Sequence, residues 1–397
     1  MIVGAARTPI GRYLGALSSL SAPQLGGIAI RAAVRRSGVP SDRIQEVIMG
    51  NVLQGGVGQA PARQAMLDAG LPASISAVTV NKVCGSGLKA VMLAAQAIRA
   101  GDADAIVAGG MESMSNAPHY LYGYRGGVKL GDQTLVDGMI RDGLWCATCN
   151  VHMGGHAEHT ARKAGIGRQR QDEFALGSHQ KAVAAASAGR FDAEIVPVTV
   201  PGKREATVVS RDESPRADTT LDALAKLKPA FVKDAPRDLP ADQLSVTAGN
   251  APGLNDGGAA VVVTSEEYAR AHGLEILGRI TAYASGGGDP QDLFFAPINA
   301  VRNLMTKAGT TIADYDLIEA NEAFAVQALA NGDALGWDWD RVNVNGGAIA
   351  LGHPIGASGT RILITLLHAL RARGATTGLA TLCLGGGNAV ALSVERV

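Results

Sequence analysis

The 397-residue sequence predicts an α/β protein built from two similar halves. Short runs of strand character alternate with segments of helical periodicity, which is typical of layered α/β proteins. One helix–strand pattern also occurs twice, about half a chain apart. Hydrophobic residues make up 47% of the chain and charged residues 18%, a balance typical of compact folded proteins. At roughly 100 to 200 residues per domain, this length indicates two or three domains.

The predicted elements follow this alternation from the first residues onward. Residues 1–11 begin directly as a strand. Further strands are predicted at 105–110, 259–265 and 378–387. After Cys84, apolar residues recur at helical spacing and predict a helix buried against a sheet. These apolar positions are Leu88, Val91, Met92, Ala95 and Ile98.

The repeated pattern covers residues 85–110 and 357–383. Each segment reads Ser-Gly, then an apolar helix, a glycine and a strand, and one insertion brings the two into register. The repeat therefore predicts two similar α/β halves. Residues 119–248 are richer in His, Arg, Asp and Pro, and we expect them to form an inserted, more irregular region where substrate loops often lie.

The composition limits the classes of partner. Lys plus Arg and Asp plus Glu both number 36, so no net charge attracts nucleic acid or an anionic membrane. No apolar run approaches the roughly 20 residues of a membrane span, and the N-terminus lacks the pattern of a signal peptide. Four cysteines do not form a disulfide framework and suit a reducing compartment. We therefore expect a cytoplasmic protein that binds neither nucleic acid nor membrane.

Two residues have the character of a nucleophile and its base. Cys84 stands at the N-terminal edge of the predicted helix, where unpaired amides and the helix dipole favour a thiolate. A free cysteine is also commonly a small buried hydrophobe, so its position alone does not decide. His353 lies in the glycine-rich segment 343–361, and an imidazole accepts the proton of a thiol.

Two further candidates lie in similar positions. Cys383 ends a predicted strand before three glycines, and Asn321 stands at a predicted helix start. A core thiol and an N-cap are the structural alternatives for these two residues. In open α/β sheets, ligands collect beyond the carboxyl ends of the strands. Because Cys84, His353, Cys383 and Asn321 all fall at strand ends or glycine loops, we expect them to converge on one pocket.

A rival constellation comprises Cys146, Cys149, His152 and His156, with His159 close behind. These residue types can hold zinc. No second cysteine pair completes a zinc-finger or ribbon pattern, so we predict no metal site and keep zinc as the alternative. A redox function of the CxxC segment lacks a thioredoxin-like context. The segment 55–61 lacks the third glycine of a dinucleotide loop, and no Walker-type sequence is present.

The chain resembles the thiolases along nearly its whole length, and is most similar to the biosynthetic acetoacetyl-CoA thiolases. The motifs that carry the resemblance are NKVCGSG (81–87), GGMESMSNAP (109–118), RGGVKLGD (125–132), VTAGNAPGLNDGGAA (246–260), NEAFA (321–325), NVNGGAIALGHPIGASG (343–359) and CLGGG (383–387).

The resemblance implies two βαβαβαββ halves stacked as five αβαβα layers, with an inserted loop domain. The N-terminal half would comprise residues 1–118 plus 249–268, and the C-terminal half residues 269–397. The loop domain, residues 119–248, would bind coenzyme A and make tetramer contacts. Its segment 125–132 resembles the loop through which biosynthetic members join two dimers, so we expect a homotetramer.

The resemblance also implies a reversible Claisen condensation of two acetyl-CoA molecules to acetoacetyl-CoA and CoA. Cys84 would carry the acetyl group, His353 would activate it, and Cys383 would remove a proton from the second acetyl-CoA. One oxyanion hole would consist of His353 and a water held by Asn321. The amides of Cys84 and Gly385 would form the other. No tightly bound cofactor is implied.

The coenzyme A site is likewise implied by the resemblance. Arg216 would meet the nucleotide end, because an anion in a neutral protein needs a local cation. The residues concerned are Leu144, His152, Met153, Arg216, Phe231, Ala248, Ala323 and Phe324.

Two departures from the family pattern leave the acyl preference open. Pro252 replaces a frequent serine, and the segment 291–300 replaces a Met-Gly-containing loop with one that includes Leu293, Phe294 and Phe295. A 2-methyl branch or a longer chain is therefore an open alternative. A degradative 3-ketoacyl-CoA thiolase and an inactive acyl-CoA- or lipid-binding relative are the other functions considered. Cys383 argues against a ketoacyl synthase, which usually pairs its cysteine with two histidines.

Overall fold

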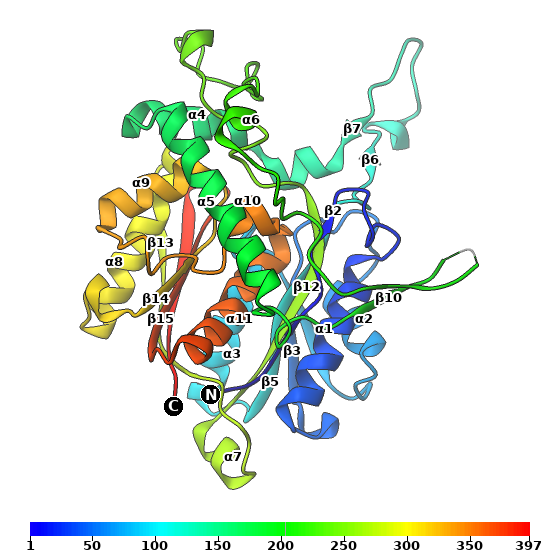
Figure 1. The fold of residues 1–397 in the computed structure, drawn as a ribbon. Coiled ribbons are helices and arrows are strands. Elements are labelled where there is room, and N and C mark those ends of the chain that lie inside the picture. The colour runs from blue at the N-terminus through cyan, green and yellow to red at the C-terminus, as the bar shows by residue number, and fades with distance from the viewer. Residues whose placement is uncertain (203) are drawn as a thin grey trace.

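The computed structural model describes residues 1–202 and 204–397, and two mixed sheets form its frame (Figure 1). The strands of the first sheet follow the order β1-β12-β5-β3-β4, with β2 paired to β12. The second sheet has the order β13-β16-β15-β14. The strand pairs β3–β4, β3–β5 and β14–β15 are parallel, whereas β12 and β16 pair antiparallel with their neighbours.

Each half contributes its own strands and helices. The first half contains β1 (Ile2–Arg7), β2 (Gly11–Arg12), α1 (Ala22–Ser37), β3 (Glu46–Gly50), α2 (Pro61–Asp68), β4 (Ser76–Val80), α3 (Ser86–Ala100), β5 (Ala105–Ser113) and β12 (Asn255–Thr264). After α7 (Glu266–Ala271), the second half contains β13 (Arg279–Gly287), α8 (Ala296–Ala308), β14 (Leu317–Ala320), α9 (Ala325–Leu335), α10 (Ala348–Leu351), α11 (Ile355–Arg373), β15 (Thr377–Leu384) and β16 (Asn388–Glu395).

Helices α3 and α11 lie between the two sheets and form the central layer. Helix α11 contacts strands of both sheets, α1 covers the outer face of the first, and α8 covers that of the second. A side chain at Gly87 or Gly359 would clash with the facing helix, so glycine permits this close crossing. The predicted five-layer α/β fold is confirmed. Although α11 is almost wholly buried, no helix of the described residues is both long and apolar enough to cross a membrane.

The predicted internal repeat corresponds to α3 followed by β5 and to α11 followed by β15. The helix predicted after Cys84 is α3, and its apolar positions Leu88, Val91 and Met92 are buried in the core shared by both sheets. The two halves differ at one strand. In the second half, a single parallel bridge between Ile318 and Val342 takes the place that the strand β4 has in the first half.

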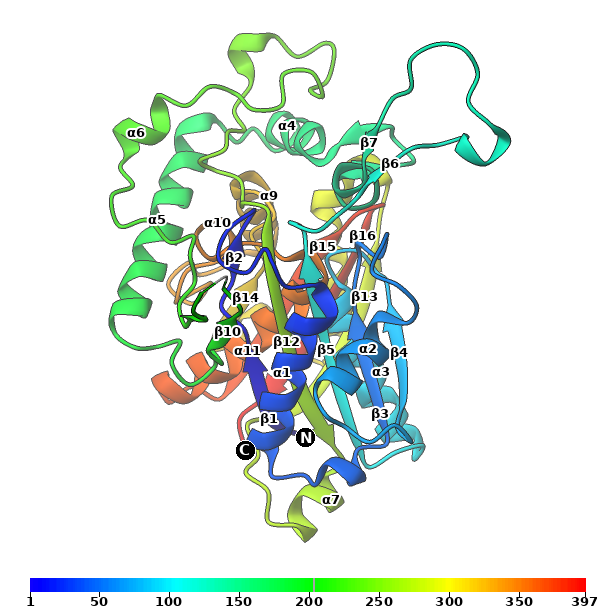
Figure 2. The same ribbon diagram turned by 90° about the vertical axis from the view of Figure 1, so that its right-hand side faces the viewer.

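The segment between β5 and β12 is more regular than predicted. It contains two long helices, of which α5 has 20 residues, because their buried faces pack on the second half. The hairpin of β6 and β7 projects from the body in both ribbon views (Figures 1 and 2). The elements of this segment are β6 (His119–Tyr120), β7 (Val136–Asp137), β8 (Trp145–Cys146), β9 (Val151–His152), α4 (Met153–Ala164), α5 (Arg168–Ser187), β10 (Val198–Val200), β11 (Thr207–Val209) and α6 (Leu221–Ala225).

A buried ion cluster fastens this segment to the first sheet. Arg7 of β1 donates from Nε to Glu194 at 2.6 Å and from Nη1 to Asp212 at 2.7 Å. The backbone N–H of Ile10 also donates to Asp212. Removing one partner of such a buried pair leaves an uncompensated charge, so the cluster fixes the chain just before Arg216.

Candidate active site

One apolar cavity of about 110 Å³ lies where the two halves and the segment between them meet. Cys84, His353, Cys383 and Gly385 all line it. These residues follow β4, precede α11, and end or follow β15. Three of the four sequence candidates, Cys84, His353 and Cys383, therefore come together from opposite halves, whereas Asn321 is not among the residues that line the cavity.

Cys84 stands on a tight turn between β4 and α3. Val83 has a φ of 47°, which is strained for a β-branched residue. The Ser86 hydroxyl accepts from the N–H of Lys82 at 2.8 Å and donates to the carbonyl of Val83 at 2.6 Å. A side chain at Gly85 would clash with Leu384, so the turn can press against β15 only because glycine follows the cysteine. The turn holds the Cys84 thiol at the cavity wall.

The expectation that the helix end favours a resting thiolate at Cys84 is wrong. Burial raises the pKa of the Cys84 thiol to about 12, and hydrogen bonds from the backbone of Cys84 and Gly385 oppose this only in part. Withdrawal of the sulfur from water thus outweighs the backbone hydrogen bonds that favour the thiolate. Cys84 rests as a thiol and needs a base to react.

His353 offers that base in a neutral form. Burial, followed by the positive charge of Arg361, lowers the pKa of His353 to about 3. Its Nδ1 lies 2.6 Å from the Ser358 hydroxyl, which itself donates to the carbonyl of Pro354 at 2.9 Å. Nδ1 therefore carries the hydrogen and Nε2 has a free lone pair. The backbone N–H of His353 donates to Asn255 at 2.8 Å, which fixes the loop.

Asn321 lies behind His353 rather than at a helix start. Its Nδ2 is 3.4 Å from Nε2 of His353, and its Oδ1 is buried without a hydrogen-bond partner among the described residues. Helix α9 begins only at Ala325, and its N-cap is Phe324, whose backbone is extended. The N-cap alternative for Asn321 is therefore wrong, and its amide is available to the imidazole.

Cys383 is the second thiol of the cavity and is almost fully buried. Burial and then the nearby Cys84 raise the pKa of the Cys383 thiol well above its usual value. The influence of Cys84 means that the two sulfur atoms lie close enough to repel as thiolates. Gly385 follows β15 and directs a backbone hydrogen bond at Cys84.

Most residues predicted to bind coenzyme A line the same cavity. Six of the eight do so, and His152 stacks on Phe231 with ring centroids 5.0 Å apart. They are Leu144, His152, Met153, Phe231, Ala323 and Phe324. A narrow apolar passage thus leads to the two thiols.

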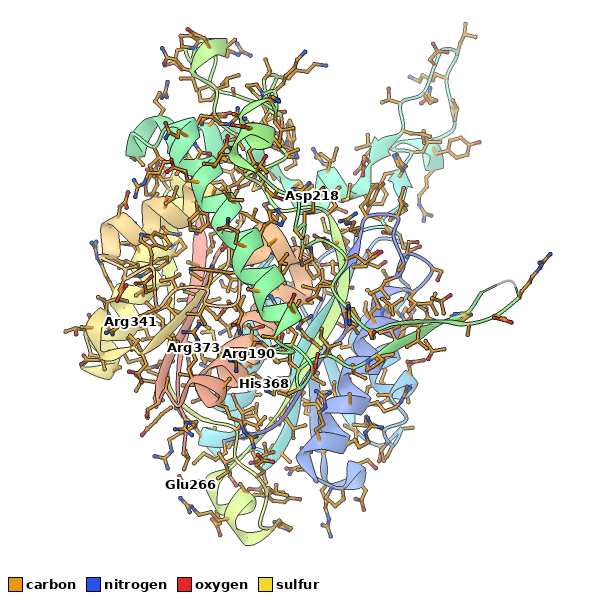
Figure 3. The ribbon with its side chains drawn as sticks, in the orientation of Figure 1. Arg190, Asp218, Glu266, Arg341, His368 and Arg373 are labelled. Atoms are coloured by element: carbon orange, nitrogen blue, oxygen red, sulfur yellow. The ribbon has the colours of Figure 1, made fainter. Side chains whose placement is uncertain are left out.

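Arg216 and Ala248 line an adjoining cavity of about 280 Å³ instead. This cavity shares Ala251, Gly253 and Leu254 with the first, so the two adjoin along this segment. The Arg216 guanidinium lies 3.3 Å from His179 of α5, and no carboxylate within residues 1–202 and 204–397 forms an ion pair with it. Asp218, labelled in Figure 3, marks the same segment beside α5.

Only part of the segment 291–300, which departs from the family pattern, lines the cavity. Leu293 and Phe294 line the cavity together with Pro252. Phe295 does not line it and instead lies under Lys163, whose Nζ is 5.5 Å from the ring centroid. Bulky apolar groups therefore surround the space beside the thiols.

The cysteines and histidines between Cys146 and His159, considered above as a zinc site, lie in three places. His152 belongs to the apolar cavity, and His159 lies 3.0 Å from Asp292. Cys146, Cys149 and His156 come together elsewhere, with ligand atoms within 4.8 Å of one another. All four cysteines are free thiols.

Comparison with known proteins identifies the family. Residues 1–267 match the N-terminal domain of thiolases and residues 274–396 match the C-terminal domain. The chain belongs to the thiolase family. An acetyl-CoA acetyltransferase from Pseudomonas aeruginosa is 54% identical over 397 residues, covering 100% of this chain and 99% of the relative. A relative of the same name from Escherichia coli is 55% identical over 398 residues, covering 100% and 99%.

A solved structure agrees with this assignment. The crystal structure of the Bacillus anthracis acetyl-CoA acetyltransferase superposes with a TM-score of 0.96 at 42% identity, covering 100% of this chain and 98% of that chain. Fold and family of this thiolase are therefore both established.

Sequence reasoning missed the residues that support the thiolase site. Glu112 is buried at the end of β5 and accepts from the N–H groups of Val52, Leu53 and Gly356, which joins both halves beneath His353. Burial raises the pKa of Glu112 to about 7. Glu112 stands within a quoted motif, as does Ser358. Their partners are set by tertiary contacts that the sequence does not reveal.

Proposed function

We propose that this thiolase catalyses the reversible condensation of two acetyl-CoA molecules to acetoacetyl-CoA and CoA through an acetyl-Cys84 intermediate. The observation that carries the proposal is the meeting of two thiols and one neutral imidazole in a single apolar cavity. The relatives named acetyl-CoA acetyltransferase, each matched over the full chain, support the same acyltransferase chemistry.

In the first half-reaction, Cys84 attacks the thioester carbonyl of acetyl-CoA. Nε2 of His353 accepts the thiol proton, which is necessary because the pKa of Cys84 is about 12. The N–H groups of Cys84 and Gly385 stabilise the oxyanion of the tetrahedral intermediate. The carbon–sulfur bond to CoA then breaks, and His353 returns the proton to the departing sulfur.

In the second half-reaction, Cys383 gives its thiol proton to Nε2 of His353, and the resulting thiolate removes a proton from the methyl group of a second acetyl-CoA. Two causes raise the pKa of Cys383, burial and the charge of Cys84. Acylation of Cys84 removes the second. Nε2 of His353, which now carries that proton, and a water held by Asn321 donate to the enolate oxygen. The enolate carbon attacks acetyl-Cys84, the Cys84 sulfur departs and takes the methyl proton from Cys383, and His353 returns its proton to Cys383.

Coenzyme A would occupy the two adjoining cavities. The pantetheine chain fits the apolar passage past His152, Met153 and Phe231, and the nucleotide end reaches Arg216. A phosphate group gains most from a cation that no carboxylate neutralises, and Arg216 meets that condition. CoA and its thioesters are the proposed substrates, with no tightly bound cofactor taking part in the reaction.

The proposal extends to the oligomeric state, the domain division and the cellular location. Segment 125–132 lies at the tip of the projecting β6–β7 hairpin (Figure 1), and Leu130, Tyr122 and Tyr124 of this hairpin are all exposed. Apolar side chains in such a position favour contact with a second copy of the chain, so we propose a homotetramer. Light scattering would measure its mass, and Leu130→Asp should reduce it. We also propose that the protein is cytoplasmic. Its proposed domains are an N-terminal half (1–118 plus 249–268), a loop domain (119–248) and a C-terminal half (269–397).

The experiment that tests the function is a survey of thiolysis rates across acyl chains. Leu293 and Phe294 crowd the small cavity, so acetoacetyl-CoA should be cleaved fastest and medium-chain 3-ketoacyl-CoA much more slowly. 2-Methylacetoacetyl-CoA measures the space left for a branch. Faster cleavage of medium chains than of acetoacetyl-CoA would instead assign a degradative 3-ketoacyl-CoA thiolase.

A further inference from the structure

A second cluster of thiol and imidazole groups lies outside the active-site cavity, where β8, β9 and α4 meet. Cys146, Cys149 and His156 each offer a ligand atom, and these atoms lie within 4.8 Å of one another. Cys146 is 3% exposed and His156 2%, whereas Cys149 is half-buried. None of these three residues has a place in the proposed condensation.

The backbone folds to bring the two sulfur atoms together. Strands β8 and β9 pair as a short hairpin with Cys146 opposite Val151. The N–H of Asn150 donates to the carbonyl of Cys146 at 2.8 Å, and Asn150 has a φ of 54°. The indole of Trp145 closes the same turn by donating to Asn150 at 3.1 Å. Three contacts thus shape the turn that carries the two thiols.

His156 supplies the observation that points to a ligand. Its Nδ1 lies 3.2 Å from the backbone carbonyl of Gln291, and because a carbonyl only accepts, Nδ1 must carry the hydrogen. Nε2 is then a bare acceptor that is buried without a hydrogen-bond partner among the described residues. Buried polar atoms without partners are uncommon, and metal-binding histidines usually donate their other N–H to such a carbonyl.

A hydrogen bond to one of the two sulfur atoms also favours a metal-bound thiolate. The backbone N–H of Cys149 donates to Sγ of Cys146 at 3.3 Å. A donor directed at sulfur stabilises the negative charge that a metal-bound thiolate bears. A disulfide between Cys146 and Cys149 would use both sulfur atoms but leave Nε2 of His156 unpaired.

We propose that Cys146, Cys149 and His156 bind a single zinc ion. Zn–S bonds of about 2.3 Å and Zn–N bonds of about 2.0 Å require ligand atoms roughly 3.5 Å apart, which the cluster reaches by a small contraction. The two thiols release their protons to solvent as the ion binds. The fourth coordination position faces a cavity lined by Cys149, His156 and His159, and a water molecule completes the tetrahedron.

Zinc at this position would fasten the hairpin to α4. Val151 pairs with Cys146, and the next residues, His152 and Met153, line the active-site cavity. A ligand that binds only the native state raises its stability, so zinc should raise the melting temperature. The inference stands independently of the proposed condensation, because it concerns different residues and a different readout.

The test is zinc stoichiometry of the full-length protein after incubation with zinc chloride and desalting. The wild type should retain one zinc ion per chain. Cys149→Ser and His156→Gln should weaken binding by about 100-fold or more. The double variant Cys84→Ser/Cys383→Ser keeps only the proposed pair of thiols, and should still bind zinc and give a thiolate–metal absorption band with cobalt.

His159→Gln is the matched control, since His159 lies one helical turn from His156 but is bound to Asp292. It should retain zinc. Protection of Cys146 and Cys149 from alkylation by zinc in the unaltered protein provides a readout that does not depend on the folding of a variant. The proposal is overturned by retention of zinc in Cys149→Ser and His156→Gln, by its loss in Cys84→Ser/Cys383→Ser, or by a Cys146–Cys149 disulfide in place of bound metal.

Discussion

Two clusters in this chain contain the same residue types, two cysteines and a histidine, and differ in the partner of the imidazole. Nδ1 of His353 meets the Ser358 hydroxyl, which can accept or donate, so either tautomer is stabilised. Nδ1 of His156 meets the carbonyl of Gln291, which only accepts, so one tautomer is fixed. The first arrangement suits an imidazole that moves protons, and the second suits a permanent ligand.

The clusters also differ in how the chain assembles them. Cys84, His353 and Cys383 come from opposite halves and meet in the apolar cavity. Cys146, Cys149 and His156 come from one hairpin and the helix that follows it. Residue type alone therefore does not assign a role, whereas the surroundings of each side chain do.

The largest difference between the clusters should appear when one cysteine of each is replaced. Cys84→Ala removes the nucleophile and should lower kcat for thiolysis of acetoacetyl-CoA by about 10⁴-fold or more. Cys149→Ser should lower it by less than about tenfold. Steady-state kinetics with circular dichroism as the control for folding would measure both. Similar losses in the two variants would remove the distinction between the clusters.

Asn321→Ala tests the donor behind the catalytic imidazole. The amide lies 3.4 Å from His353, and loss of one oxyanion donor typically costs about 100- to 1,000-fold in rate. The loss should fall on kcat, because the donor acts on charge that develops during reaction. An unchanged kcat would exclude Asn321 from the reaction.

The pH dependence of alkylation tests the state of the resting thiol. The pKa of Cys84 is raised to about 12, so the thiolate fraction is small near neutrality and grows as pH rises towards 12. The rate of reaction with iodoacetamide should therefore increase about tenfold per pH unit between about pH 7 and 9. A flat profile over this range would indicate a thiolate already formed, and acetyl-CoA should block labelling.

Ser358→Ala should have a moderate effect, because it deprives His353 of its 2.6 Å partner. A lost buried hydrogen bond of this kind corresponds to roughly tenfold in kcat/KM. Ser358→Thr keeps the hydroxyl and should recover most of the activity. Equal loss in both variants would assign Ser358 to packing alone.

Arg216→Ala should have the smallest effect of the series. Its guanidinium is exposed, so loss of a phosphate contact there should raise KM for acyl-CoA by about fivefold with little change in kcat. Arg216→Lys keeps the charge, so its KM should lie between those of the wild type and Arg216→Ala. A change in kcat without a change in KM would contradict a role at the nucleotide end.

Local patterns were sufficient to predict the main elements. The apolar spacing after Cys84 predicts α3, and the repeated helix–strand pattern predicts the two halves. The glycine loops also led to both thiols and the imidazole. These features depend on residues close together in sequence.

Features set by tertiary contacts were missed or predicted wrongly. Asn321 resembles an N-cap, yet its N–H donates to the carbonyl of Thr381 and α9 begins only at Ala325. The pKa of Cys84 is raised by burial that no local pattern reveals. Zinc at Cys146, Cys149 and His156 was kept only as the alternative because no second cysteine pair completes a zinc-finger or ribbon pattern, and the proximity of the three ligand atoms is set by the fold.

The central claim is that Cys84 carries the acyl group while Cys383 removes the proton. The most direct measurement is peptide mass spectrometry of the Cys383→Ala variant after incubation with acetyl-CoA in deuterated water. The account predicts an acetyl group on the peptide of Cys84 and no deuterium in the methyl group of the remaining acetyl-CoA. An acetyl group on another residue, or methyl exchange as fast as in the wild type, would contradict it.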